Sequence, residues 1–576
     1  MALFLSFVFI VTWNVFFPPT PPNNDELENT IQSDTNKPHN MQKEFVANEV
    51  ASAFGNNNID TVRAWIDDLE RNGSLSIEFA ATNIETPLMS IDLINAGTSI
   101  KNLKILESND NILKHVGAWD ALGAHYDAQA PVELARDAFC NPCLLIDGQA
   151  VRFELISKVE FEGKSVDENY HVIESKDIHS GTIVKKTIIY NNSYNIDHIF
   201  SGLPQNNVAL VWDGGLLPSE QLINDDMLYF SVYAQNQDSY QEEYLSSVSG
   251  SERFEFNDNV GWAGLKSKYF MTAITNDNYR SFKADRVVFK AKEGVKIEGA
   301  QTINSDMTLY YKNLYDGTLK INSYIGPIDT HYLETEQNQH LVQLFGFGWF
   351  IIGYLGKLIM WLLTGLYAFI PNYGVVCILF AFIIRVFTGP LTKKSFLSNQ
   401  KMQAVQPKLK KIQEKYKDDS VKLNQEIMNL YKTEGVNPLG GCLPILIQMP
   451  LLIALFQVFR KTIEFRGAPF LPFWITDLSQ PDVILQFDFL KQIWGISYFF
   501  GHGIALLPII MGVVMFLNMK MTTSSNINPS QASTMYIMNG FFILLFNTFP
   551  SGLNLYYTIY NILNFFQQRK LQKSGT

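Results

Sequence analysis

Residues 373–391 read YGVVCILFAFIIRVFTGPL, and this stretch decides the class of the protein. Its length suits a helix that crosses the roughly 30 Å hydrocarbon layer of a membrane. Arg385 is the one charge within it. An arginine at such a depth is costly, so it usually faces a partner or a hydrated cavity, unless its side chain reaches the headgroups near Lys393. The stretch therefore predicts a transmembrane helix with a functional cation.

The sequence around this stretch continues the same pattern. Four segments contain no Asp, Glu, Lys or Arg: 358–384, 438–459, 492–519 and 521–568. About 20 apolar residues are enough for one crossing, and the longest segment, interrupted by a polar turn at 547–554, has room for two. Soluble folds rarely contain such runs. The C-terminal region is therefore predicted to be a polytopic α-helical membrane domain.

The composition of the whole chain excludes several other classes. The chain has 576 residues, 47% of them apolar, and only four Cys, which excludes intrinsic disorder and a small disulfide-stapled fold. Its charge is divided unevenly. Residues 1–338 contain 25 basic and 47 acidic side chains, a net charge of −22, whereas the remainder contains 20 and 9, a net charge of +11. The two regions are therefore expected to lie in different surroundings.

The only long charged stretch of the second region, 393–437, predicts a cytoplasmic helical hairpin. It holds ten Lys and five acids, and apolar residues recur at helical spacing on either side of Asp418 and Asp419. Excess Lys is retained on the cytoplasmic side of a membrane, so both termini, including a tail at 569–576, are predicted to be cytoplasmic. The predicted crossings are 1–17, 373–391, 437–459, 504–521, 534–549 and 553–568. Residues 493–503 are too short to cross and are predicted to lie at the interface.

The acidic region indicates an anchored all-β domain outside the cytoplasm. Residues 1–17 are apolar and lack a basic start and a small-residue cleavage site, which favours an uncleaved anchor. Residues 18–50 are polar and rich in Pro and Asn, as in a flexible linker. From 51 to 335, period-2 alternation between turn residues predicts a large β-sandwich. An aromatic-rich segment at 341–370 follows, and it is predicted to be a span or an amphipathic interfacial helix.

Other candidate sites are few. Cys140 and Cys143 form a CxxC motif, for which a local disulfide or a chance pair is favoured over a redox site. The nine His lack metal spacing, and no nucleotide-binding or hydrolase motif occurs, so we expect no enzyme activity, metal, cofactor or DNA binding. No other predicted span holds an Asp or Glu. We therefore expect Arg385 to attract an anionic group from outside the protein, either a carboxylate on another chain or a lipid phosphate.

Several motifs resemble those of the YidC membrane protein insertases. They are Asn437 to Pro444 (NPLGGCLP) followed by Gln448-Met449-Pro450, Phe549 to Leu553 (FPSGL) followed by Leu555-Tyr556-Tyr557, Arg385 with 390–393 (PLTK), and 406–408 (QPK). The resemblance covers about 345–568. It implies a five-helix insertase core with a hydrophilic groove open to the cytoplasm and to lipid, an N-terminal anchor helix and, as in Gram-negative members, a large periplasmic domain.

The resemblance also implies which residues act. It places four residues at the groove: Arg385, Gln448, Met511 and Tyr557. Asp418 and Asp419 at the hairpin tip would belong to the region that meets the ribosome, the targeting receptor or the Sec translocon, and the segment near Trp361 would be the family's amphipathic helix. Ala381 departs from the family pattern, which often has a hydroxyl one turn before the arginine.

A protein of this family inserts nascent membrane proteins into the bacterial inner membrane, alone or beside the Sec translocon and without ATP, and this is the function that we expect. Two other functions fit parts of the sequence. A secondary transporter of an anionic solute would use Arg385, but it should show inverted repeats, which we do not find. A membrane-anchored binding protein would act through the β-sandwich, with a sugar as one candidate ligand.

Overall fold

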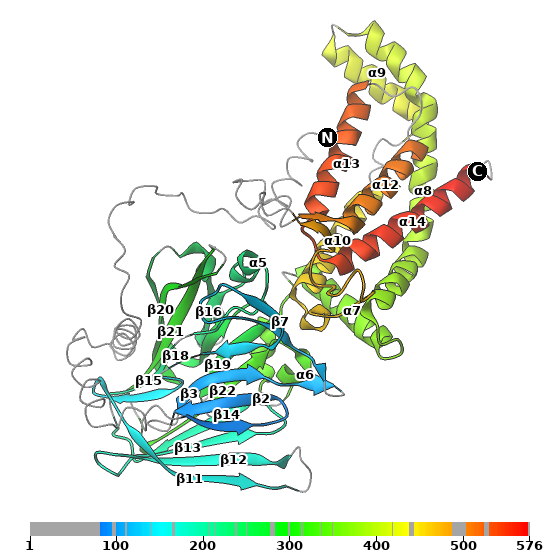
Figure 1. Ribbon diagram of the computed structural model, residues 1–576. Helices are drawn as coiled ribbons and strands as arrows, with labels where there is room; N and C mark the ends of the chain where they lie inside the picture. The colour runs from blue at the N-terminus through cyan, green and yellow to red at the C-terminus, as the bar shows by residue number, and fades with distance from the viewer. Residues whose placement is uncertain are drawn as a thin grey trace, which may run out of the picture. The chain divides into compact units, whose positions relative to one another are not determined.

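A computed structural model gives the structure of the chain (Figure 1). It describes residues 81–573, apart from 95–98, 110–111, 137, 139, 164–167, 206, 214, 237–238, 249, 277–282, 298–299, 313, 315, 336, 348–349, 418, 437–442, 487–502 and 523–528. The predicted anchor at 1–17, the linker at 18–50 and most of the predicted interfacial segment 493–503 lie outside the described residues. The chain forms two compact units, divided between Pro327 and Ile328.

The first unit is dominated by one long antiparallel sheet. Its strands, in the order in which they pair, are β10 (Gln149–Ala150), β9 (Cys143–Ile146), β15 (Val208–Trp212), β21 (Ala300–Tyr311), β20 (Ala284–Ile297), β18 (Glu252–Lys266), β19 (Phe270–Asn276), β22 (Thr318–Pro327), β14 (Asn195–Ser201), β13 (Val184–Tyr190), β12 (Tyr170–Asp177) and β11 (Phe153–Phe161). Strands β16 (Ser231–Asn236) and β17 (Ser239–Tyr244) branch from β18. Two short helical segments, α5 (Ile223–Met227) and η2 (Leu245–Ser247), lie within this part of the chain.

Smaller antiparallel sheets complete this unit. One has the order β1 (Ala81–Glu85), β2 (Met89–Ile94), β3 (Ser99–Ile105) and β8 (Glu133–Ala135). Two further pairs are β4 (Ser108–Asn109) with β5 (Ile112–Leu113), and β6 (Val116–Trp119) with β7 (Tyr126–Pro131). In β13 the buried residues alternate with more exposed ones, whereas every residue of β15 and β19 is buried. The period-2 pattern thus marks strands with one buried face, and the continuous apolar runs mark central strands.

The long sheet folds over so that its two ends meet. The Lys185 amine, on β13, donates a hydrogen bond to the Pro142 carbonyl at 3.2 Å, next to the start of β9. These strands are the tenth and the second in the pairing order, so a flat sheet would keep them far apart. Figure 1 shows β11–β14 on one side of the unit and β16, β18, β20 and β21 on the other. The prediction of a large all-β domain is confirmed.

The second unit is mainly helical. Its elements are α6 (Thr330–Leu333), η3 (Gln339–Leu344), α7 (Phe350–Tyr367), α8 (Tyr373–Lys415), α9 (Ser420–Thr433), α10 (Leu443–Lys461), η4 (Ile463–Phe465), β23 (Val483–Gln486), β24 (Gly503–Ala505), α12 (Leu506–Thr522), α13 (Pro529–Phe546) and α14 (Ser551–Lys573). Within the described ranges the core helices are five: α8, α10, α12, α13 and α14. Figure 1 shows the hairpin of α8 and α9 at one end of this unit and α7 at the other.

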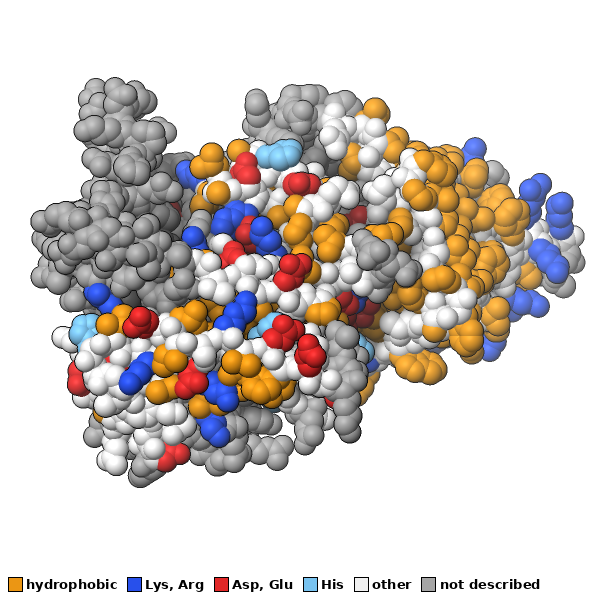
Figure 2. Space-filling view, turned by 60° about the horizontal axis from the view of Figure 1, so that its bottom comes forward, with side chains coloured by type: hydrophobic (Ala, Val, Ile, Leu, Met, Phe, Trp, Pro, Cys, Tyr) orange, Lys and Arg blue, Asp and Glu red, His pale blue; other side chains and the backbone are white. Residues whose placement is uncertain are grey.

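The helices of this unit carry a strongly apolar surface. One of them, Tyr373–Lys415, is long and apolar enough to cross a membrane, and shorter apolar helices cover Ile351–Tyr367, Leu506–Met521 and Tyr536–Phe546. Exposed apolar side chains on α8 include Phe382, Val386 and Phe387. Figure 2 shows hydrophobic side chains gathered over the helical part, with basic side chains at its tip. Such a surface is suited to lipid rather than to water.

Two helices differ in extent from the sequence expectation. The predicted span at 373–391 and the first arm of the hairpin form one continuous helix of 43 residues, which passes through Pro390 and Pro407. A proline removes one backbone hydrogen bond and bends a long helix without ending it. The predicted interfacial helix at 341–370 is shorter, because α7 begins only at Phe350 and a 3₁₀ turn precedes it. Phe347 is buried and packs against Gly356 of α7.

Candidate functional site

Arg385 lies in α8 and its guanidinium is held mainly by side chains of α14. One terminal nitrogen, Nη2, donates to Asn564 Oδ1 at 2.9 Å and to Gln567 Oε1. The other, Nη1, donates to Thr392 Oγ1 at 3.3 Å and to the Tyr560 hydroxyl at 3.5 Å. The arginine is only 8% exposed. Polar side chains, rather than apolar ones, therefore cover most of this cation.

Helical periodicity brings these polar residues together. Tyr560, Asn564 and Gln567 follow one another at spacings of four and three, which places them on one face of α14. Arg385, Thr388 and Thr392 have spacings of three and four on α8. The Thr388 and Tyr560 hydroxyls are 3.1 Å apart, and the Arg385 guanidinium carbon lies 5.3 Å from the centre of the Tyr560 ring, within cation–π range. We refer to these six residues as the Arg385 cluster.

The charge of Arg385 is not neutralised within the described part of the chain. Its hydrogen-bond partners are two hydroxyls and two amides, and no carboxylate forms an ion pair with it there. Its Nε is buried without a hydrogen-bond partner. Neutral partners satisfy the geometry of a guanidinium but leave its field in place. The arrangement is therefore suited to attract an additional anionic or strongly polar group.

A series of unsatisfied polar atoms continues along α14 from this cluster. Among the described residues, the following buried side-chain atoms have no hydrogen-bond partner: Asn554 Oδ1, Tyr556 OH, Tyr557 OH, Thr558 Oγ1 and Gln568 Oε1 on α14, and Asn539 Oδ1 on α13. Buried polar atoms in proteins are almost always bonded to protein or to ordered water. These atoms make α14 a polar helix within the interior of this unit, and ordered water is one source of the missing hydrogen bonds.

The residues expected at the groove from the sequence are not among the hydrogen-bond partners of Arg385. Met511 and Tyr557 are buried, and Gln448 is half-buried. Tyr557 packs against the Phe546 and Tyr556 rings, at 5.6 and 5.0 Å between ring centres. The hydrogen bonds of the guanidinium go instead to partners that the sequence argument did not select.

Helical spacing is the only feature of the sequence that could have indicated those partners. Tyr560, Asn564 and Gln567 recur at four and three residues, but polar side chains are frequent throughout this helix, so spacing alone does not choose among them. Ala381, one turn before Arg385, provides no hydroxyl. Two hydroxyls instead lie one and two turns after Arg385 on α8, at Thr388 and Thr392.

At the opposite end of the core helices, one loop binds the first turns of both α12 and α14. Ser551 N donates to Gln480 O at 2.8 Å, and Gly552 N donates to Leu478 O at 3.0 Å. Leu507 N donates to Asp482 Oδ2 at 2.8 Å. Free N–H groups at helix starts need such acceptors. The loop 477–482, which we call the end loop, therefore satisfies two helix starts and fixes them side by side.

A carboxylate is buried in the end loop. Asp482 is 5% exposed, and burial raises its pKa to about 6, against the opposing effect of the backbone N–H groups at the start of α12. Its place at a helix N-terminus is favourable for a negative charge. The residue therefore has a structural role at the end of the core.

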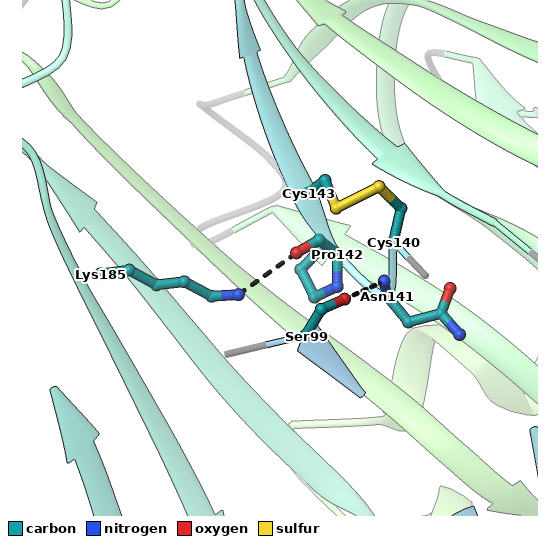
Figure 3. The surroundings of a disulfide bond; sticks show 6 residues. All are labelled: Ser99, Cys140, Asn141, Pro142, Cys143 and Lys185. Atoms are coloured by element: carbon teal, nitrogen blue, oxygen red, sulfur yellow. Dashed lines mark hydrogen bonds between the residues drawn. A yellow bond between two sulfur atoms is a disulfide. The ribbon is translucent and has the colours of Figure 1, made fainter. Parts of the chain in front are cut away.

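The remaining predicted site residues lie elsewhere. Asp419 caps α9, because its Oδ1 accepts a hydrogen bond from Lys422 N at 3.0 Å, whereas Asp418 lies outside the described residues. In the β unit, Cys140 and Cys143 form a disulfide (Figure 3). The enclosed turn is held from both sides, by Ser99 through the Asn141 N–H and by Lys185 through the Pro142 carbonyl. This pair therefore fastens the start of β9.

Comparisons with known proteins cover both units. The family described as "60Kd inner membrane protein" matches residues 365–576, and the family "YidC periplasmic domain" matches residues 178–362. A protein named membrane protein insertase YidC from Chlorobium limicola is 30% identical over 98% of this chain and 93% of its own length. Its namesake from Prosthecochloris aestuarii is 36% identical over 65% of this chain and 62% of its own length.

Solved structures with similarity to the chain have much lower identity. A crystal structure titled as an active YidC insertase with the first transmembrane domain resolved is 17% identical, covers 87% of this chain and 97% of that chain, and has a TM-score of 0.34. The relative from Chlorobium limicola extends over nearly the whole chain, and it carries the assignment. The chain therefore belongs to the YidC membrane protein insertase family, as an inner-membrane protein with a periplasmic domain.

Proposed function

We propose that this chain inserts nascent membrane proteins into the inner membrane along a hydrated groove between α8 and α14. The observation that supports the proposal most is the Arg385 cluster, a cation held by neutral groups beside a series of orphan polar atoms. The relatives that match the chain are named as insertases, and those matches offer no support for a secondary transporter.

The proposed topology follows from charge. Lysines of the hairpin and the cations that end α14 are retained in the cytoplasm, so the start of α8 and the end loop lie on the periplasmic side. Six crossings, counting the N-terminal segment, then place the β unit in the periplasm and both termini in the cytoplasm. The groove opens toward the cytoplasm, and the end loop closes it toward the periplasm by fixing the starts of α12 and α14.

The mechanism is a lowering of the barrier to translocation. Water and polar side chains halfway through the membrane shorten the hydrocarbon path that a polar segment must cross. Arg385 attracts an acidic or polar front of the substrate, while the apolar part of the substrate moves into lipid. Burial of apolar surface supplies roughly 25 cal/mol per Å², so a whole helix provides the driving free energy without a nucleotide.

The hairpin is the proposed docking region for the machinery that delivers substrates. Its second helix, α9, has no buried residue, and Val421 and Met428 on it are exposed, so its apolar side is open to a partner. Asp419, the N-cap of α9, marks the tip, and Asp418, its neighbour in the sequence, is proposed to act with it. We place contacts with the ribosome, the targeting receptor or the Sec translocon here, as the family resemblance implies.

The electrostatic part of the proposal is tested by reversing one charge. In reconstituted vesicles, Arg385→Glu should slow insertion of substrates with acidic translocated tails by tenfold or more, about 1.4 kcal/mol, and should affect matched neutral tails less. The control is Arg569→Glu, which makes the same charge change on an exposed residue of α14. Equal effects of the two variants, or equal effects on both kinds of tail, would remove Arg385 from the mechanism.

A further inference from the structure

Two loops at one end of the helical unit present the most exposed large apolar side chains among the described residues. Phe369, between α7 and α8, is 87% exposed, and Phe473, in the loop after η4, is 85% exposed. Both rings point away from the protein interior although nearby aromatic residues are buried. Single exposed apolar residues are common, but two at the apex of adjoining loops need an explanation.

The two loops are joined and ordered by hydrogen bonds. The Asn372 side chain caps α8 by accepting a bond from Val375 N at 3.0 Å, and it also donates to the Phe470 carbonyl at 3.2 Å. Gly374 lies directly against the Phe470 ring, where a Cβ would come within 2.2 Å of that ring. The loops carrying Phe369 and Phe473 therefore form one surface.

The backbone behind each phenylalanine is fixed. Phe470 N donates to Ile475 O at 3.0 Å, and Leu471 O accepts bonds from both Trp474 N and Ile475 N at 2.9 Å, so Phe473 stands at the apex of a tight turn. On the other loop, Phe369 N donates to Leu366 O at 3.1 Å. Because these turns are closed by their own hydrogen bonds, neither ring gains burial by a simple collapse of its loop.

The composition of the two loops favours lipid over water. Residues 366–376 (LYAFIPNYGVV) and 468–476 (APFLPFWIT) contain no Asp, Glu, Lys or Arg. The helix that precedes the Phe369 loop, α7, has an exposed apolar face. Its residues recur at helical spacing and are between 57% and 73% exposed: Ile351, Tyr354, Leu358 and Trp361. Aromatic and apolar side chains of this kind collect at the boundary between headgroups and acyl chains.

The geometry points to a second membrane-contact site beyond α7: the Phe369 and Phe473 apices insert into the periplasmic interface of the bilayer. The occupant is lipid, because the surface continues the exposed apolar face of α7 and carries no charge that would select a protein partner. The inference uses the proposed placement of the helices in the membrane, but it does not depend on the groove or on insertion activity.

The test measures the surroundings of each apex in the full chain within lipid vesicles. Cys377→Ala and Cys442→Ala remove the two cysteines outside the disulfide, and nitroxide labels are attached to Phe369→Cys, Phe473→Cys and a control, Leu122→Cys. Leu122 is 80% exposed but belongs to the β unit. Collision rates with oxygen, which concentrates in lipid, and with a water-soluble nickel chelate are compared by electron paramagnetic resonance.

We expect the logarithm of the oxygen-to-nickel ratio to be positive at 369 and 473 and negative at 122. A negative value at 369 and 473 would overturn the inference, because the apices would then lie in water. Protection from both reagents would also overturn it, since protein would cover the surface. Two separate apices guard against a labelled variant that fails to fold. Failure here leaves the insertion assays on Arg385 variants untouched, so the two proposals fail separately.

Discussion

At the scale of single residues, Arg385 is a buried positive charge whose hydrogen-bond partners are all electrically neutral. The hydroxyls of Thr392 and Tyr560 and the amide of Asn564 accept hydrogen bonds from the guanidinium at 2.9–3.5 Å, and the amide of Gln567 is a fourth acceptor. No carboxylate within the described chain cancels the charge of Arg385. A buried ion pair would be costly to separate when a substrate arrives. Hydroxyl and amide partners can exchange with water or with a substrate at a smaller cost, which suits the substrate site that we propose here.

The sequence identifies Arg385 because one charge within an apolar run is visible without a structure. Its partners are harder to find, because α14 also contains other Asn and Tyr residues at helical spacing. Only the packing of α14 on α8 selects Tyr560, Asn564 and Gln567. The groove positions expected at Gln448, Met511 and Tyr557 stay predictions.

A glycine of the FPSGL motif gives a test at this scale. A Cβ on Gly552 would lie 2.8 Å from the Phe459 ring and 3.2 Å from the Leu478 carbonyl, so Gly552→Ala forces the end loop and α10 away from α14. We expect a loss of stability of about 1–3 kcal/mol. The control is Gly540→Ala on α13, where no atom lies within 4 Å and the better helix propensity of Ala should stabilise the protein slightly. Thermal unfolding in detergent measures both, and equal midpoints for the two variants would contradict the packing argument.

At the scale of elements, structure that is set by local sequence can be predicted, whereas structure that depends on contacts between residues far apart in the sequence cannot. The helices of the core follow from runs without charge, and the hairpin turn beside Asp419 follows from its cap. The continuity of α8 does not, because Pro390 suggests a break that the surrounding turns of a long helix overcome. The fold-over of the long sheet also escapes prediction, since it depends on contacts such as that between Lys185 and the Pro142 carbonyl.

Asp226, a buried carboxyl group in α5, is expected to make the stability of the β unit depend on pH. Asp226 is fully buried and accepts hydrogen bonds from Ser219 N at 3.1 Å and Lys268 N at 3.3 Å. Burial, together with the nearby charge of Glu220, raises its pKa to about 7. The folded protein then holds a proton that the unfolded chain releases above its ordinary pKa near 4, so this group lowers stability as the pH rises toward neutrality.

Replacing this carboxyl group should remove its pH dependence. Buried His198, whose pKa burial lowers, contributes the opposite slope, so the useful quantity is the difference between parent and variant. Relative to the parent, Asp226→Asn should gain up to about 2 kcal/mol of stability in the β unit between about pH 5 and about pH 7. Denaturant unfolding measures this, with exposed Asp316→Asn as the control. A difference that does not change with pH would show that Asp226 is charged in the folded protein.

At the scale of the whole molecule, the surface of the first unit suits water and the surface of the second unit suits lipid. The boundary between the acidic and basic parts of the sequence, at residue 338, lies close to the division between the units after Pro327. The first unit has a large antiparallel β core, and the second exposes apolar helices and buries a group of polar side chains on α8 and α14. Charge and hydropathy predict this organisation, because each is a property of long segments. The proposed hydration of the second unit rests on individual buried polar atoms, which only the structure identifies.

The central claim is that the Arg385 cluster receives the substrate, and site-specific photocrosslinking tests it most directly. A photoreactive aromatic residue replaces Tyr560, inside the cluster, or Phe566, which is 59% exposed on the same helix. A ribosome-stalled membrane protein with its first segment emerging is then irradiated in vesicles. The account predicts crosslinks from position 560 well in excess of those from position 566. Crosslinks from 566 alone, or equally from both positions, would contradict it, because the substrate would then pass the core along its lipid-facing surface.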